Sequence, residues 1–269
     1  MLKDITLGQF FPAKSPLHKM DPRGKLLLLI LIIVFIFVAG NAFSLGLVTV
    51  FLIAAMFLSR VPVKIYLKNI KSIWVIILLT AVLNALYVDE GTVLCEFWVF
   101  QITTGGIQRA IFMAVRIVLL ILSSAMLTYS TTPTALTDAI ERLLSPLKYI
   151  GLGTAVHTLA MMMTIALRFI PTLIEETEKI MNAQKARGAD LESGGLLKRM
   201  KALLPVLIPL LVSSFRRAYD LAEAMECRCY NGGKGRQRMK QLHFGLVDLF
   251  GGLISLLVCA GVIVLNILL

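Results

Sequence analysis

Two arginines have the residue type and the setting that could do chemistry in this chain. Arg187 lies in the stretch "NAQKARGADL" and Arg228 in "AMECRCYNGG", each at the end of a long helical pattern. The planar guanidinium group makes bidentate contacts with a carboxylate and also hydrogen-bonds to the carbonyl groups at a helix end. This chemistry suits recognition of a docked protein.

A simpler interpretation is that each arginine only ends its own helix. A cation in the last turn stabilises a helix by about 0.3–1 kcal/mol, and a glycine after it adopts the left-handed backbone freely. This accounts for Arg187 and Gly188. It accounts less well for Arg228, because Cys229 follows it and we expect the later stretch 231–233, "NGG", to end that helix. An arginine retained without its glycine indicates that the arginine itself is used.

The other reactive side chains do not form a recognisable catalytic or metal site. Cys227 and Cys229 lie near His243, but the sequence has no second cysteine pair and no histidine pair at the spacing of a zinc site. The glycine-rich stretch "NGGKGRQ" lacks the spacing of a P-loop. We therefore expect free thiols, no catalytic residue, no metal and no cofactor. A membrane enzyme that uses Cys227 or His157 remains an alternative.

The elements that carry these arginines belong to a membrane protein. The chain has 269 residues, of which 58% are hydrophobic, and the apolar residues are concentrated in runs. A helix needs about 20 mostly apolar residues to cross a bilayer, with a lower limit of about 17. We predict an all-α membrane fold with about five transmembrane helices. They lie near 25–39, 42–58, 73–88 and 108–129 in a membrane region 1–129, with the last at 245–269.

The distribution of charge predicts an orientation in the membrane. The net charge is +11, and the loop after the second apolar run carries four cations and no acid. Residues 89–106 carry acids and no Lys or Arg. Because cytoplasmic loops are rich in Lys and Arg, we expect the N-terminus and residues 130–244 inside the cell and the C-terminus outside. The basic surface would then face anionic lipid or an acidic partner.

Residues 130–244 have a different pattern from the apolar runs. A short helix opens the segment in "STTPTALTDAIERLLSPLKYIG", and a long one is predicted from near Thr154 to Arg187. A third helix leads to Arg228. Both long helices have an apolar half followed by an amphipathic half, so we expect them to pair or cross. Bends are expected at their prolines, which are Pro171, Pro205 and Pro209.

Four stretches of the sequence resemble one known family. They are "SPLHKMDPRGKL" (15–26), "STTPTALTDAIERLLSPLKYIG" (130–151), "LRFIPTLIEETEKIMNAQKARGAD" (167–190) and "PLLVSSFRRAYDLAEAMECRCY" (209–230). In order and spacing they are similar to the transmembrane T component of energy-coupling-factor (ECF) transporters, the CbiQ-like family. The resemblance implies that 130–244 is a cytoplasmic coupling domain of three helices, two of them long, bent and crossed.

The resemblance also implies which residues carry the coupling. In that family each long helix ends in an Ala-Arg-Gly motif that docks on one of two ABC-type ATPases. The first motif matches at Ala186, Arg187 and Gly188. The second departs from the pattern and consists of Cys227, Arg228 and Cys229.

The function implied is that of a non-catalytic subunit of an ECF-type ABC importer in the cell membrane. It would couple ATP hydrolysis by two partner ATPases to movement of a small membrane S component, which binds a vitamin or a metal ion. No nucleic acid partner is expected. The alternative is a membrane scaffold whose basic insert binds anionic lipid or another cytoplasmic partner.

Overall fold

A computed structural model describes residues 10–87, 92–97, 100–151, 153–189, 195–231 and 243–268. The chain divides into two compact units. The bundle unit comprises Gly8–Ala139 and Gln241–Leu269, and the insert unit comprises Met1–Leu7 and Ile140–Lys240. Helices dominate both, which confirms the all-α membrane fold, with one short β-hairpin in addition.

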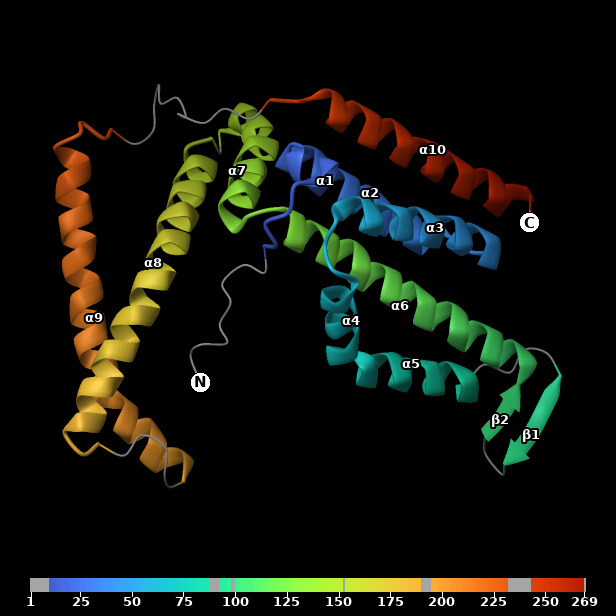
Figure 1. Ribbon diagram of the computed structural model, residues 1–269, viewed down its shortest axis with the longest axis horizontal. Coiled ribbons are helices and arrows are strands. Elements are labelled where there is room, and N and C mark those ends of the chain that lie inside the picture. Colours follow the sequence, from blue (N-terminus) through green and yellow to red (C-terminus); the bar gives the residue numbers. More distant parts are fainter. Residues whose placement is uncertain are drawn as a thin grey trace. The chain divides into compact units, whose positions relative to one another are not determined.

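Seven helices of the bundle unit are described. They are α1 (Pro16–Lys19), α2 (Pro22–Val38), α3 (Ala42–Ser59), α4 (Val63–Ser72), α5 (Trp74–Tyr87), α6 (Thr104–Ser130) and α10 (Leu246–Leu268). Helix α6 packs against α2, α3 and α5, while α10 packs against α2 and α3 (Figure 1). Helix α7 (Pro133–Leu143) crosses the boundary between the two units.

The core of the bundle unit is formed where four helices meet. Ile36 of α2, Val48 of α3, Leu119 of α6 and Val262 of α10 are all buried in one cluster. The outward faces of the same helices are also apolar, and α5 has no buried residue. A soluble protein rarely exposes apolar surface of this extent, so the surrounding medium is hydrocarbon.

Residues of the 15–26 stretch fix the start of α2. Asp21 caps the helix by accepting a hydrogen bond from the Arg23 N–H (2.9 Å), and Pro22 occupies the first turn. The Asp21 N–H donates to the carboxylate of Asp248 (2.7 Å), which also accepts from the Gly245 N–H (2.7 Å). The motif therefore joins the start of α2 to the start of α10.

The region after α3 differs from the sequence prediction. A helix was expected at 73–88, and the preceding cationic stretch was predicted as a loop. The structure instead has two helices, α4 and α5, that meet at 59° beside Ile73 (Figure 1). Helix α4 forms because Tyr66 and Ile70, four residues apart, lie on one side while the lysines lie on another.

A β-hairpin precedes α6, and the sequence did not predict it. Strand β1 (Val93–Phe97) pairs antiparallel with β2 (Phe100–Thr103). Helix α6 begins at 104 rather than at the expected 108, because the Thr103 hydroxyl accepts a hydrogen bond from the Gly106 N–H (3.0 Å).

The insert unit contains a short 3₁₀ helix, η2 (Ser145–Ile150), and the two long helices α8 (Gly153–Ala186) and α9 (Leu196–Glu226). Gly151, with φ +84, separates η2 from α8. Helix α8 continues through Pro171 as one element. Helix α9 bends within its N-terminal half, the part of its sequence that holds both of its prolines (Figure 1).

Within the part of the chain that the structure describes, five helices are long and apolar enough to cross a membrane. They are α3, α6, α8, α9 and α10, and the bent pair α4–α5 would be a sixth span. The expected set differs, since it included α2 and left out α8 and α9. Helix α2 has 17 residues, about the lower limit for a span. Helices α8 and α9 qualify because one half of each is apolar.

Candidate functional site

The two long helices of the insert unit pair in opposite directions. The Gln184 side-chain amide of α8 donates to the Pro205 carbonyl of α9 (3.4 Å). Two turns earlier on α8, Glu176 accepts a hydrogen bond from Ser213 and lies 3.1 Å from the guanidinium of Arg217. As the residue number falls on α8 it rises on α9, so the pairing is antiparallel and joins the C-terminal half of α8 to the middle of α9.

This pairing places the two arginine tips at opposite ends of the helix pair (Figure 1). Arg187 follows closely after Gln184 and its contact with Pro205. Arg228 lies about 35 Å along α9 from Pro205, at a rise of about 1.5 Å per residue. Two separate partners could therefore each contact one tip.

The first tip ends as the sequence predicted. Gly188 has φ +84 and ends α8 in a Schellman motif. Its N–H donates to the Lys185 carbonyl (3.0 Å), and the Ala189 N–H donates to the Gln184 carbonyl (3.0 Å). Arg187 is therefore the C-cap residue of the helix.

The second tip overturns the expectation that the stretch 231–233 ends the helix. Cys229 has φ +56, the left-handed conformation that Gly188 adopts at the first tip. The Cys229 N–H donates to the Glu226 carbonyl (2.8 Å), and the Tyr230 N–H donates to the Met225 carbonyl (3.0 Å). This is the same motif as at the first tip, with a cysteine in place of glycine.

The two arginines consequently occupy one equivalent position, the residue before the left-handed turn. A missing cap does not distinguish Arg228 from Arg187, because both helices are capped in the same way. Sequence reasoning missed this equivalence because a non-glycine residue in the left-handed region is uncommon and residue type does not reveal it.

Both guanidinium groups are available to a partner. Arg187 and Arg228 are exposed, and neither side chain has a hydrogen bond or ion pair with any residue that the structure describes. Their neighbours at the tips are also exposed, namely Ala186, Gly188, Cys227 and Cys229. Each arginine therefore presents all its N–H donors on an open helix end.

An apolar face extends along α9 between the tips. It consists of Leu204, Leu207, Ile208, Leu211 and Phe215, each at least half exposed. Their spacing of three and four residues puts them on one side of the helix. Within one helix, the insert unit thus offers an apolar contact surface and a terminal cation.

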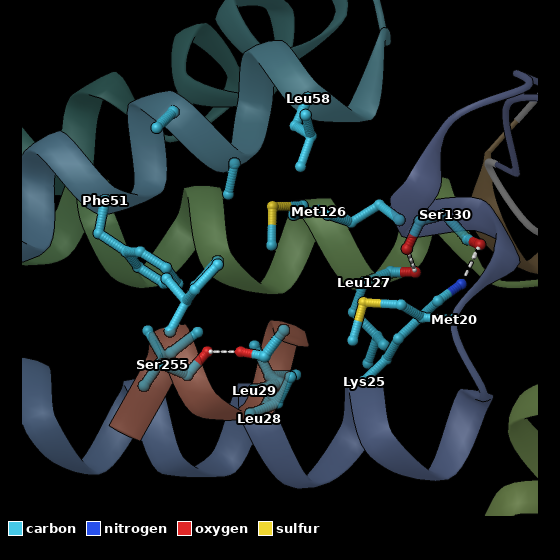
Figure 2. Close-up of a pocket in the computed structure, with 17 residues that line it drawn as sticks. Met20, Lys25, Leu28, Leu29, Phe51, Leu58, Met126, Leu127, Ser130 and Ser255 are labelled. Carbon is cyan, nitrogen blue, oxygen red and sulfur yellow. Dashed lines mark hydrogen bonds between the residues drawn. The ribbon is translucent and has the colours of Figure 1, made fainter. Parts of the chain in front are cut away.

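The bundle unit contains an apolar cavity of about 290 Å³ between α2, α3, α6 and α10 (Figure 2). Three serines line it, and each hydroxyl donates to a main-chain carbonyl of its own helix; they are Ser123, Ser130 and Ser255. Lys25 also lines the cavity, and its amine donates to the Ser130 carbonyl (2.8 Å) and the Thr131 hydroxyl (3.4 Å). Each of these polar groups already has a hydrogen-bond partner, and the described residues that line the cavity include no Asp, Glu or His that could form an acid–base pair with Lys25.

His157 and the cysteines, which could serve an enzyme or a metal site, are not arranged as such a site in the described part of the chain. His157 Nδ1 lies 3.0 Å from the Glu141 carboxylate, a pairing that the sequence did not reveal. Cys227, Cys229 and Cys259 are free thiols. Among the residues that the structure describes, no three His, Cys, Asp or Glu side chains gather as metal ligands would.

Arg116 lies well inside an apolar span and faces the bundle. It donates to the Ala39 carbonyl at the end of α2 (2.6 Å), and its guanidinium lies 4.8 Å from the Phe112 ring centre. This contact satisfies a carbonyl group at the end of a helix. From the sequence alone, an arginine within an apolar run could face a helix bundle or a partner, or extend to the membrane surface.

Comparison with known proteins identifies the family. The family model for CbiQ, described as a cobalt transport protein, matches residues 13–240. The chain belongs to the CbiQ family. This match includes both arginine tips and most of the bundle unit.

Several relatives carry the name energy-coupling factor transporter transmembrane protein EcfT. The protein of Acidaminococcus fermentans is 49% identical over 256 residues, which cover 95% of this chain and 94% of that protein. That of Ruminiclostridium cellulolyticum is 50% identical over 248 residues, with 92% of each chain covered. That of Bacillus subtilis is 44% identical over 242 residues, covering 90% of this chain and 91% of that protein. The family expected from the four sequence stretches is confirmed.

Proposed function

We propose that this chain is the T component of an ECF-type ABC importer and couples ATP hydrolysis by two partner ATPases to movement of a substrate-binding S component. The observation that carries the proposal is the equivalence of Arg187 and Arg228. Each is the exposed C-cap residue of a Schellman motif, and each lies at one end of an antiparallel helix pair. One arginine would contact each ATPase.

The free guanidinium groups support docking onto a helix end or a carboxylate. An arginine can make two parallel hydrogen bonds with a carboxylate, which fixes orientation as well as affinity. The left-handed turn after each arginine ends the helix abruptly, so each arginine lies at an exposed helix end. Such a tip would fit a groove on the surface of an ATPase.

Transmission would run through the pairing of α8 with α9. When the ATPases close on ATP, they would move the two tips relative to each other. The contacts of Glu176 with Ser213 and Arg217 hold the middle of the pair together, so a displacement of one tip would rotate its helix about that point. The exposed apolar face of α9 would pass this movement to the S component.

The chain itself would be non-catalytic, with ATP hydrolysis on the partner subunits. The S component would bind the transported vitamin or metal ion. Residues 130–244, which include α7, α8 and α9, would form a coupling domain on the cytoplasmic side, since their charge suits the inner face of the membrane. The C-terminus would lie outside.

Purification of the chain from its own cells in a mild detergent tests the class of function. We expect two nucleotide-binding subunits and a small hydrophobic membrane protein to copurify. Recovery of the chain without any nucleotide-binding subunit, under conditions that keep a control ABC transporter intact, would contradict the proposal.

A further inference from the structure

Helix α4 has three distinct faces: one is cationic and exposed, one is apolar and exposed, and one is buried. One face is cationic and exposed, and consists of Lys64, Lys68 and Lys71. At about 3.6 residues per turn, these three lysines fall within a sector of roughly 60°. The neighbouring sector is apolar yet open, because Val63 is 41% and Leu67 57% exposed. The third face carries Tyr66, which is 1% exposed.

Tyr66 fixes the rotation of α4 about its axis. Its ring packs edge-on against that of Tyr129 in α6, with ring centres 5.2 Å apart. Its hydroxyl lies 3.2 Å from that of Ser59, itself fully buried, at the end of α3. Because this face is held against the bundle, the apolar and cationic faces remain directed away from it.

The bend between α4 and α5 places α4 at the edge of the hydrocarbon layer. Helix α5 is uncharged, and its 14 residues reach about 21 Å, short of the roughly 30 Å of a bilayer core. Helix α4 departs from the α5 axis by 59° and so extends obliquely from the end of the span. Trp74 at the junction is half exposed, as is typical of aromatic residues at the membrane interface.

The cations of α4 have no ion-paired acid among the residues that the structure describes. The sequence from Arg60 to Tyr87 contains no Asp or Glu. The three lysines make no ion pair with any residue in the described part of the chain. A face that holds several uncompensated cations beside an exposed apolar face is typical of a helix that lies in a membrane surface.

We propose that α4 binds the headgroups of anionic phospholipids through Lys64, Lys68 and Lys71, with Val63 and Leu67 immersed in the acyl chains below. The surface is independent of the arginine tips and of the proposed coupling function. In the proposed orientation it lies in the cytoplasmic leaflet, where anionic lipids give the membrane a negative surface potential.

Trp74 provides a local probe for this proposal. A Trp98→Phe variant leaves Trp74 as the single tryptophan, since the chain has two. The purified variant would be reconstituted alone into vesicles of phosphatidylcholine and phosphatidylglycerol, with bromine on the acyl chains of one lipid or of the other. Stronger quenching by the brominated phosphatidylglycerol indicates that this lipid is enriched beside α4.

We expect phosphatidylglycerol to be enriched about two- to fivefold at Trp74 in low salt, and the preference to fall towards one in 1 M NaCl because salt screens exposed charges. Changing all three lysines (Lys64→Gln, Lys68→Gln, Lys71→Gln) should also bring the ratio close to one. The salt comparison needs no substitution in α4, and Lys68→Gln alone should give a partial loss if the triple variant does not fold.

A matched control removes three exposed cations from the insert unit (Lys179→Gln, Lys201→Gln, Arg216→Gln) and should keep the preference. Equal quenching by the two brominated lipids in the Trp98→Phe variant, with all three lysines present, would overturn the proposal. The lysines would then be free to bind an acidic protein partner instead. A preference that survives in the α4 triple variant, or that only the insert control removes, would also overturn it.

Discussion

Cys229 adopts a backbone conformation that glycine adopts more easily. A non-glycine residue in the left-handed region costs about 1–2 kcal/mol, and the two hydrogen bonds of the Schellman motif offset that cost at the end of α9. Cys229 thus takes the place of the glycine of the Ala-Arg-Gly pattern and keeps the left-handed backbone conformation of that glycine. The arginine before it keeps its position.

This conformation predicts that Cys229→Gly stabilises the insert unit. Relief of the strain should raise the free energy of unfolding by about 1 kcal/mol, or a few degrees in Tm for a chain of this size. Thermal unfolding in detergent would measure it.

Cys227→Gly is the matched control, because Cys227 has the ordinary helical values φ −58 and ψ −23. A glycine there should destabilise the helix end by up to about 1 kcal/mol. Shifts of Tm in the same direction for both variants would contradict this account of the second tip.

At the same scale, residue type predicted the first tip and missed the second. A glycine after a basic helical pattern indicates a helix end directly, as Gly188 does. The two hydrogen bonds at Cys229 join main-chain groups, so the residue types in the sequence do not predict them. The pairing of His157 with Glu141 was missed for a different reason, because they are far enough apart in sequence that only the fold brings them together.

At the scale of elements, periodicity predicted the long helices closely. The helix predicted from 154 to 187 corresponds to α8 at 153–186. A pattern of this length, apolar in its first half and amphipathic in its second, indicates a helix rather than a strand. The same periodicity is present in α4, where Tyr66 and Ile70 lie on one side and the lysines on another, but this cationic stretch was predicted as a loop. The β-hairpin is short and gives only a weak pattern. Which turn of α8 faces which turn of α9 depends on tertiary packing.

That packing predicts a role for Glu176. Glu176→Ala removes the acceptor for Ser213 and the partner of Arg217, and so weakens the link between α8 and α9. The pair is partly exposed, so we expect a modest fall in Tm of about 1–3 °C and a larger fall in substrate uptake per ATP hydrolysed. Reconstituted vesicles that contain the whole complex would measure both uptake and hydrolysis.

Glu175→Ala serves as the control, because Glu175 is exposed and makes no hydrogen bond or ion pair with the described residues. It should leave uptake per ATP unchanged. Equal effects of the two substitutions would show that the link through Glu176 does not transmit movement.

At the scale of the whole molecule, the charge distribution predicts the orientation of the chain. Asp89 and Glu90 lie outside the residues that the structure describes, so this prediction depends on the sequence and the positive-inside rule. In a Cys95→Ser variant, the exposed thiols of Cys227 and Cys229 should react with a membrane-impermeant maleimide only after the cells are permeabilised.

A cysteine at the other end of the chain gives the opposite expectation. Leu268 is exposed at the end of α10, and a Leu268→Cys variant without the other cysteines should be labelled in intact cells. Labelling of Cys227 and Cys229 in intact cells would place the insert unit outside and contradict the proposed coupling role.

If each arginine tip holds one ATPase, the number of ATPases bound to the chain tests this coupling role most directly. Native mass spectrometry of the purified complex should find two ATPase subunits for the parent chain, one for Arg187→Glu or Arg228→Glu, and none for the double variant. Arg216→Glu, which reverses an exposed charge elsewhere on α9, should keep both. Two ATPases bound to the double variant, with substrate uptake at the parent rate, would contradict the account.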